Sequence, residues 1–222
     1  RECDLVVSGD GSTVITKDLY LSGYNLTRTY ENNPFRLQLT DGGLLRVLRY
    51  TTIWTNGLVR LDGGTLANST QGVVNRGRLE GRGELKRQDP LGTVVWDNHG
   101  TIQPGLTNWA FGDLVFTNCN LTLRPSRRLV FDLGGTGAGE YSRIVVHGQA
   151  SLDGACRVRL APGYVPKHAD VFHILDAGSF SGEIASFDLP DISPANWETE
   201  DLAAAGVLKV YGPPRETIVI VR

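Results

Sequence analysis

Short apolar segments separated by turn residues make up most of the chain. Residues 5–7, 14–15, 19–21, 35–39 and 44–48 are either continuously apolar or alternate between apolar and polar positions. Gly, Asn, Asp or Ser bounds each segment, and these residues supply turns between strands. Only residues 200–205 have a helical pattern, and Gly206 would end that helix after little more than one turn. The pattern therefore predicts an all-β protein.

A recurrent motif connects these predicted strands. Two or three apolar residues are followed by Asn, Asp or His, then by Gly, one further residue and another apolar residue. The motif occurs in residues 59–66, 73–81, 94–102 and 145–154. The interval from Gly77 to Gly100 is in the low twenties, and that from Gly100 to Gly148 is close to twice as long. Gly64 precedes Gly77 by little more than half the first interval, so the repeat is irregular.

An interval in the low twenties is typical of one coil of a β-helix, in which short strands joined by turns stack to bury a continuous apolar interior. We therefore predict a right-handed parallel β-helix (a β-solenoid) with coils over residues 1–160. Residues 161–212 are expected to hold terminal coils and a cap, and residues 213–222 a Pro-Pro spacer and a final strand. An antiparallel sandwich or jelly roll also has many short strands and is the alternative fold.

Composition limits the partners and the cellular location that we expect. The formal net charge is −2, so no overall electrostatic attraction to nucleic acid or to an anionic membrane is expected. No apolar run is long enough to span a membrane as a helix. The chain contains no methionine, so we interpret residue 1 as the boundary left by a removed signal peptide, or as the end of a trimmed fragment. The first interpretation predicts an extracellular or cell-surface protein.

Three cysteines leave two alternatives open. An odd number in a secreted chain suggests one disulfide and one leftover thiol. A Cys119–Cys156 disulfide is expected if their strands are neighbours, with Cys3 free or paired between subunits; the alternative is three buried thiols. The sequons at Asn25, Asn68 and Asn120 are candidate glycosylation sites if the source is eukaryotic.

We predict no catalytic residue, cofactor or metal site. The glycines of residues 135–139 are followed by a strand, not by the helix that a phosphate loop needs. Ser142 and His147 lack a nucleophile elbow, and a strand would place His173 opposite Asp170 and Asp176, which is a poor arrangement for a metal. The best candidate for glycan chemistry or Ca²⁺ binding is a stack of three acidic residues on neighbouring coils: Asp62, Glu80 and Asp97.

The second half of the chain resembles the end of an autotransporter passenger, and more closely the autotransporter-associated β-strand repeat proteins. The resemblance rests on segments that keep their order: residues 99–105, 112–114, 129–135, 141–148, 150–154, 162–166, 171–177, 182–184, 197–199 and 206–210. It implies a β-helix with a structural or adhesive role and no catalytic residues. The outer-membrane barrel of a true autotransporter does not follow here, so self-translocation is not implied.

Two function classes follow from the sequence. The first is a secreted structural or surface protein, such as a self-assembling subunit of a filament, sheath or matrix, or an adhesin. The second is a carbohydrate-binding or carbohydrate-active β-helix, for which surface glycans would be the partner. Residues 217–221 are apolar and β-branched at both alternating sets of positions, so a strand formed there needs cover on both faces. It either folds back on its own domain or is donated to a neighbouring subunit, through Thr217, Ile218, Val219, Ile220 and Val221.

Overall fold

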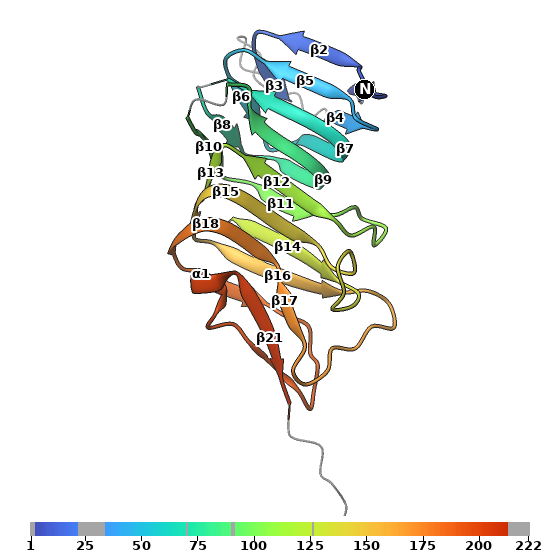
Figure 1. Ribbon diagram of the computed structural model, residues 1–222, viewed down its shortest axis with the longest axis vertical. Coiled ribbons are helices and arrows are strands. Elements are labelled where there is room, and N and C mark those ends of the chain that lie inside the picture. The colour runs from blue at the N-terminus through green and yellow to red at the C-terminus, as the bar shows by residue number, and fades with distance from the viewer. Residues whose placement is uncertain (1–2, 22–33, 70, 90–91, 126, 213–222) are drawn as a thin grey trace, which may run out of the picture.

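The protein is a parallel β-helix in which three strand-bearing faces wind around one apolar interior (Figure 1). The computed structural model describes residues 3–21, 34–69, 71–89, 92–125 and 127–212. Eighteen strands form one continuous parallel sheet, because each strand pairs with its counterpart in the next coil. The predicted solenoid is confirmed, and the antiparallel sandwich was the wrong alternative.

Face A contains the first strand of every coil. Successive strands of this face place the following residues in register: Leu58, Arg78, Thr101, Arg128 and Ala155. The number of residues between successive partners is larger in the C-terminal part of this series, so the coils lengthen in that direction. The strands of this face are β1 (Cys3–Ser8), β4 (Phe35–Thr40), the first halves of β7 (Gly57–Asn68) and β9 (Arg78–Arg87), β11 (Thr101–Pro104), β14 (Arg128–Leu133), β16 (Ala155–Leu160) and β19 (Ser186–Asp188).

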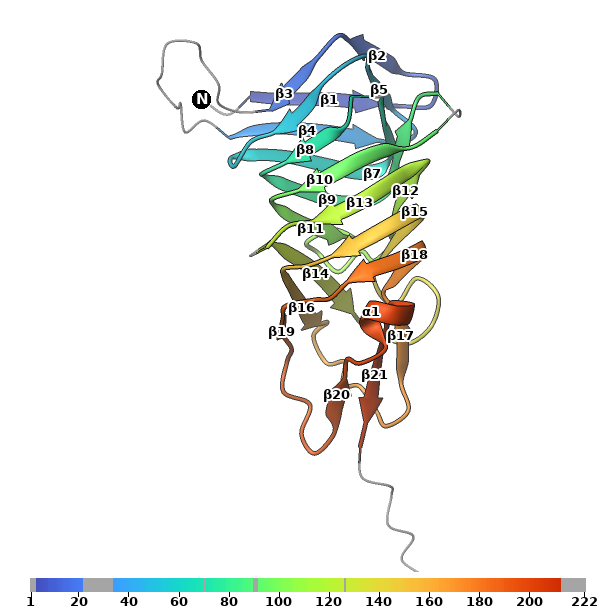
Figure 2. The same cartoon turned by 90° about the vertical axis from the view of Figure 1, so that its left-hand side faces the viewer.

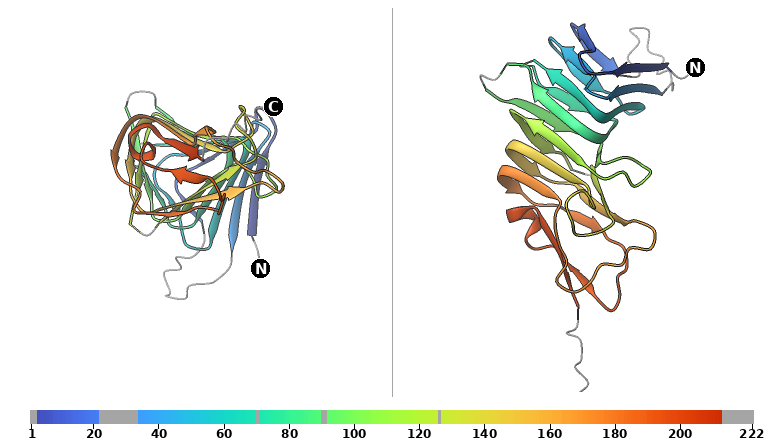
Figure 3. Two further views of the ribbon diagram at one scale, coloured as in Figure 1. Left: turned by 90° about the horizontal axis from the view of Figure 1, so that it is seen from below. Right: turned by 45° about the vertical axis from the view of Figure 1, so that its right-hand side comes forward.

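Faces B and C complete each coil. Face B comprises β2 (Thr13–Thr16), β5 (Leu44–Val47), the second halves of β7 and β9, β12 (Asp113–Thr117) and the first halves of β15 (Arg143–Leu152) and β18 (Leu175–Gly182). Face C comprises β3 (Leu19–Leu21), β6 (Thr51–Ile53), β8 (Val73–Asn75), β10 (Val94–Asn98), β13 (Cys119–Leu123) and the second halves of β15 and β18. Seen along the axis, the coils superpose around the same interior (Figure 3).

Alternation along each strand explains why these sequences form coils. In β4 the side chains of Leu37 and Leu39 point inward and are fully buried, whereas Arg36 and Gln38, which alternate with them, point outward. The same column of the interior continues through successive coils, so an inward residue in the middle of the stack is covered by the coils above and below it. The largest fully buried side chains are Trp96, Phe116, Phe131 and Phe172.

The Asn-x-Gly part of the repeated motif forms a corner between faces C and A. Asn75 and Asn98 are buried and adjacent in register, and Asn75 Nδ2 donates to Asn98 Oδ1 over 2.7 Å. Each asparagine also accepts a hydrogen bond from the backbone N–H of the glycine two residues later, Gly77 or Gly100. A side chain on Gly100 would place its Cβ 2.1 Å from the Gly77 carbonyl oxygen, so the motif needs glycine to let the coils stack closely.

The last coil is closed by a separate element, the C-terminal cap. It consists of an antiparallel sheet of β17 (Val171–His173), β21 (Val207–Tyr211) and β20 (Asn196–Glu198), together with the single helical turn α1 (Leu202–Ala205) (Figure 2). The predicted helix is confirmed, and Gly206 ends it in the left-handed conformation at φ 69°. Parallel pairing continues beyond Leu160 through β18 and β19 before the cap closes the coils.

Candidate functional site

Among the described residues, the first coil of the solenoid, β1 to β3, is open at its N-terminal side. Within the described ranges, β1 pairs only with β4, β2 only with β5, and β3 only with β6. The second edge of each of these three strands therefore has no strand partner there. This edge lies at the end of the molecule opposite the C-terminal cap (Figure 2).

The apolar interior is also less covered in the first coil than in the second. Val14 is in register with Leu45 and lies over it, but Val14 is 36% exposed whereas Leu45 is fully buried. Leu5 is only half-buried over the fully buried Leu37. Unpaired strand edges beside incompletely covered apolar side chains make the first coil a surface that another chain can extend.

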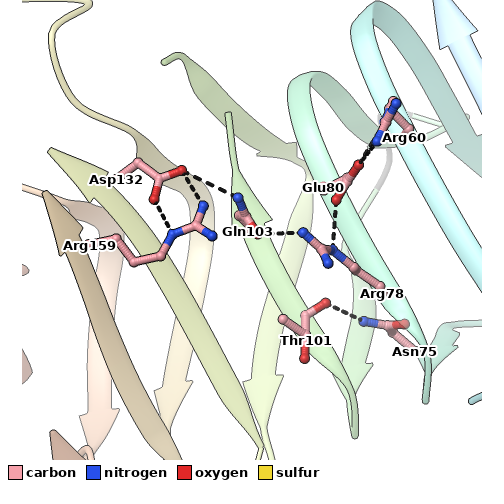
Figure 4. Close-up of polar contacts among 8 residues, drawn as sticks. All are labelled: Arg60, Asn75, Arg78, Glu80, Thr101, Gln103, Asp132 and Arg159. Atoms are coloured by element: carbon pink, nitrogen blue, oxygen red, sulfur yellow. Dashed lines mark hydrogen bonds and ion pairs between the residues drawn. The ribbon is translucent and has the colours of Figure 1, made fainter. Parts of the chain in front are cut away.

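Face A has a second feature, a line of charged and amide side chains that crosses five successive coils (Figure 4). It runs along the outer side of the sheet from β7 to β16. Glu80, Gln103 and Asp132 lie at its base and are 1% exposed. The side chains that cover them are arginines: Arg60, Arg78 and Arg159.

Both oxygens of the Glu80 carboxylate are occupied by arginines. Arg60 Nε donates to Oε1 over 2.6 Å, and Arg78 Nε forms an ion pair with Oε2 at 2.6 Å. The side chains of Arg60 and Arg78 remain 36% and 42% exposed. A buried carboxylate thus fixes two guanidinium groups whose outer parts face solvent.

The Asp132 carboxylate is bound in a similar way. Arg159 donates from Nε to Oδ1 over 2.6 Å and from Nη2 to Oδ2 over 2.7 Å, and Gln103 Nε2 donates to Oδ2 over 3.3 Å. Hydrogen bonding to Asp132 raises the pKa of the Arg159 guanidinium above its ordinary value. Arg78 Nη2 donates to Gln103 Oε1 over 2.7 Å and so joins the two carboxylate clusters.

An aromatic side chain lies at one end of this line. The Arg159 guanidinium carbon is 5.6 Å from the centroid of the half-buried Trp109 ring. Trp109 lies in a tight turn in which Leu106 N–H donates to the Ala110 carbonyl, and its own φ of 63° is unusual for a residue with a side chain. The turn holds the ring over face A.

The candidate stack of Asp62, Glu80 and Asp97 does not form. Asp62 is in register with Arg82, and Glu80 lies between Arg60 and Gln103 on face A. Asp97 lies on face C, where burial acts to raise its pKa but hydrogen bonds from Arg124 and His99 outweigh burial and hold the pKa low. Because the coils differ in length, positions that look equivalent in the sequence motif fall on different faces or at different register positions.

The predicted Cys119–Cys156 disulfide is also wrong. Cys119 in β13 lies beside β10 and β15, whereas Cys156 in β16 lies beside β14 and β19, so the two strands are not neighbours. Both thiols are free and buried, and burial raises the pKa of each to about 12. Cys3 begins β1 in the first coil.

The two candidate glycosylation sites within the described ranges differ. Asn68 is fully buried, and its side-chain oxygen accepts a hydrogen bond from the Thr51 hydroxyl, so the folded protein does not offer it for glycosylation. Asn120 is half-buried on β13 and accepts a hydrogen bond from the Gln149 backbone N–H over 2.9 Å. Asn25 and residues 217–221 lie outside the described residues.

The cluster of histidine and aspartate near residue 170 has structural contacts. Asp170 Oδ2 accepts hydrogen bonds from the Lys167 backbone N–H and the Tyr164 hydroxyl, and His168 Nδ1 accepts one from the Gly212 backbone N–H. Among the residues that the structure describes, no group of three or more His, Cys, Asp or Glu side chains is placed to hold a metal ion. In the same ranges, none of the helices has the length and apolar character needed to cross a membrane.

Comparisons with protein-family models, with curated proteins and with solved structures found no match for this chain.

Proposed function

We propose that this protein is a secreted structural or adhesive subunit of a cell surface, and that it associates with copies of itself through its first coil. The observation that carries the proposal is the open edge of β1 to β3, with Val14 36% exposed above a fully buried Leu45. A strand edge beside apolar side chains gains backbone hydrogen bonds and apolar burial when a further strand is added.

The occupant that we propose for this edge is the C-terminal segment of a second copy, residues 217–221. The C-terminal cap covers the last coil, which disfavours simple head-to-tail stacking of two solenoids. The sequence of residues 217–221 is β-branched throughout and apolar from Ile218 to Val221, as expected for a strand covered on both faces. Cys3, at the start of β1, would then cross-link neighbouring copies in an oxidising compartment.

The extracellular location rests on the resemblance to autotransporter passengers and autotransporter-associated β-strand repeat proteins, whose members are mostly adhesins and surface structural proteins. The solenoid fold is compatible with this resemblance. A stack of coils forms an elongated, regular scaffold whose ends are its natural points of extension.

Glycan cleavage is disfavoured by the state of the buried carboxylates on face A. A glycosidase needs one carboxylic acid to donate a proton and a second carboxylate to act as base or nucleophile. The Glu80 and Asp132 oxygens instead contact arginines at 2.6–2.7 Å, and both residues are 1% exposed, so neither carboxylate is free to reach a glycosidic bond. This arrangement supports a binding or structural role over a catalytic one.

Sedimentation velocity over a range of protein concentrations tests the proposal with three variants. Val14→Lys places a charge on the open edge, and deletion of residues 217–222 removes the proposed donor strand. Val95→Lys makes the same exchange at a 45% exposed position of β10 in the middle of the solenoid and serves as the control.

We expect wild type and Val95→Lys to form oligomers as the concentration rises, and both other variants to remain monomeric. If Val14→Lys alone is monomeric, two first coils pair directly and the tail is not the donor. A wild-type protein that stays monomeric throughout would refute self-association.

A further inference from the structure

The outer side of face A carries arginines whose positions are fixed from below. The acidic partners Glu80 and Asp132 are 1% exposed, while the side chains of Arg60, Arg78 and Arg159 are 32–42% exposed. Carboxylates therefore form the base of this surface, and guanidinium groups form the part that a ligand would meet (Figure 4). Because the arginines are already held in place, binding through their remaining N–H groups would cost little side-chain entropy.

The charge of this surface is not balanced. Two buried carboxylates face three arginines, since Glu80 is shared by Arg60 and Arg78. Arg128 adds a further positive charge: it is exposed, and no side-chain partner for it occurs among the described residues. The whole chain has a net charge of −2, so this excess is local to the face and is not a property of the protein as a whole.

Two of the arginines lie in register along the solenoid axis. Arg78, Thr101 and Arg128 are register partners on three successive strands of face A. Strands in a sheet lie about 4.8 Å apart, so the Cα atoms of Arg78 and Arg128 are separated by about 10 Å along the solenoid axis. We name Arg60, Arg78, Arg128 and Arg159 the arginine row. Three of these arginines are fixed by buried carboxylates, and the four are spread over five successive strands of the face, from β7 to β16. Such an arrangement suits an extended polymer with repeated anionic groups, because several weak contacts then act together.

The Trp109 ring indicates which kind of polyanion fits this row. It lies against Arg159 at one end of the row, on a turn that holds it over the sheet. A fixed aromatic ring beside polar side chains is a typical means of packing against the apolar face of a ring-containing ligand while the polar groups orient it. Guanidinium groups bind carboxylate and sulfate oxygens with charge-assisted, often bidentate, hydrogen bonds.

We propose that the arginine row, together with Trp109, binds an anionic linear polysaccharide along face A. The anionic groups of the glycan, carboxylates of uronic acids or sulfates, pair with the guanidinium groups. A sugar ring packs on Trp109. This site lies on the side of the solenoid and is independent of the open first coil, so binding does not require self-association.

The test is isothermal titration calorimetry at low salt with polygalacturonate, which carries carboxylates, and heparin, which also carries sulfates. Dextran serves as the neutral polymer and single-stranded DNA as a polyanion without sugar carboxylates or sulfates. The test variant is Arg78→Gln with Arg128→Gln: Arg60 still pairs with Glu80, and a glutamine at position 78 keeps an N–H donor for Gln103. The matched control is Arg46→Gln, an exposed arginine on face B.

We expect wild type to bind at least one of the two anionic glycans, and binding to weaken as salt is added. The double variant should lose affinity by roughly tenfold or more, because two charge-assisted contacts are removed, while Arg46→Gln binds like wild type. Which of the two glycans binds more tightly identifies the anionic group. The proposal is overturned if neither glycan binds, if dextran or single-stranded DNA binds equally well, or if the double variant binds like wild type with an unchanged thermal midpoint.

Discussion

The two ends of this solenoid meet their surroundings in different ways. At the C-terminal end, β18 of the last complete coil is covered by the cap: Leu175 N–H donates to the Gly206 carbonyl, and Leu202 of α1 is 2% exposed. At the N-terminal end, the second edges of β1, β2 and β3 have no strand partner in the described ranges. The coils have the same interior at both ends, so the difference lies only in what covers them.

This difference illustrates how the ends of a parallel β-helix decide whether a further strand can be added to the stack. Each coil is a template for the next, and a stack with a free edge accepts any strand that fits. The cap ends the stack of parallel coils, because its own strands pair in antiparallel fashion and a helical turn packs beside them. Under our proposal, the first coil, whose second edges have no strand partner in the described ranges, is the end at which copies associate.

The largest expected difference comes from removing one apolar side chain at each end. Phe172 is fully buried in the cap, where it contacts the rings of Tyr141 and Trp197. Phe172→Ala should lower the free energy of unfolding by about 3–5 kcal/mol. Val14→Ala, at the open end, should cost about 1 kcal/mol, because Val14 is already partly solvated. Urea denaturation of both variants at a concentration where the protein is monomeric checks this, and equal losses would contradict the contrast between the two ends.

The stacked corner at Gly100 should be less tolerant of added volume than Gly212 beside the cap. A Cβ at Gly100 would lie 2.1 Å from the Gly77 backbone oxygen, which cannot move without separating two coils. Gly100→Ala should therefore destabilise the protein by about 3 kcal/mol. The control is Gly212→Ala next to the cap, where the nearest atoms lie at an ordinary 3.4 Å. Thermal unfolding of the two variants compares them, and a Gly100→Ala midpoint equal to that of the control would count against close stacking at this corner.

The buried asparagine corner is expected to have the next largest effect. Asn75→Ala removes the donor to Asn98 Oδ1 and the weaker contact to the Thr101 carbonyl, and leaves these buried acceptors with fewer partners. The expected loss is about 2 kcal/mol. Asn108, which is exposed in the turn before Trp109, provides the control substitution Asn108→Ala. Chemical denaturation gives both values, and a neutral Asn75→Ala would show that the corner is held by the glycines alone.

The smallest effect concerns the interior thiols. Burial raises the pKa of Cys119 and of Cys156 to about 12, so almost no thiolate is present at neutral pH. In the native protein neither should react with a thiol-specific reagent, whereas both should react once denaturant is added. Mass spectrometry after labelling at pH 7 identifies the modified cysteines. Rapid native labelling at either position would show that the middle coils open readily, although both of their edges are paired.

The fold was predictable because its signals are local and repeated. The Asn-x-Gly corners at residues 75–77 and 98–100, the alternation in strands such as β4, and the helix end at Gly206 each follow from a few neighbouring residues. Together, these local signals favour stacked coils over an antiparallel sandwich.

The surface features were not predictable, because they depend on the register between coils. Asp62 is in register with Arg82, and Asp97 lies on face C, so neither is a register partner of Glu80. The pairing of β9 with β11 brings together Glu80 and Gln103, which lie a full coil apart in the sequence and show no motif. The alternation of Arg, Glu and Gln at outward positions was the available signal for the arginine row. This signal could not be interpreted without the lengths of the turns, which set the register between coils.

Amide hydrogen exchange measured at low and at high protein concentration tests most directly whether the first coil is the surface through which copies associate. If it is, the edge amides of β1 to β3 that do not bond to β4 to β6 should exchange rapidly at low concentration and become protected at high concentration. Amides of β17, β20 and β21 in the cap should exchange at the same rate at both concentrations. Protection that does not change in the first coil, or that increases in the cap instead, would contradict association through the open end.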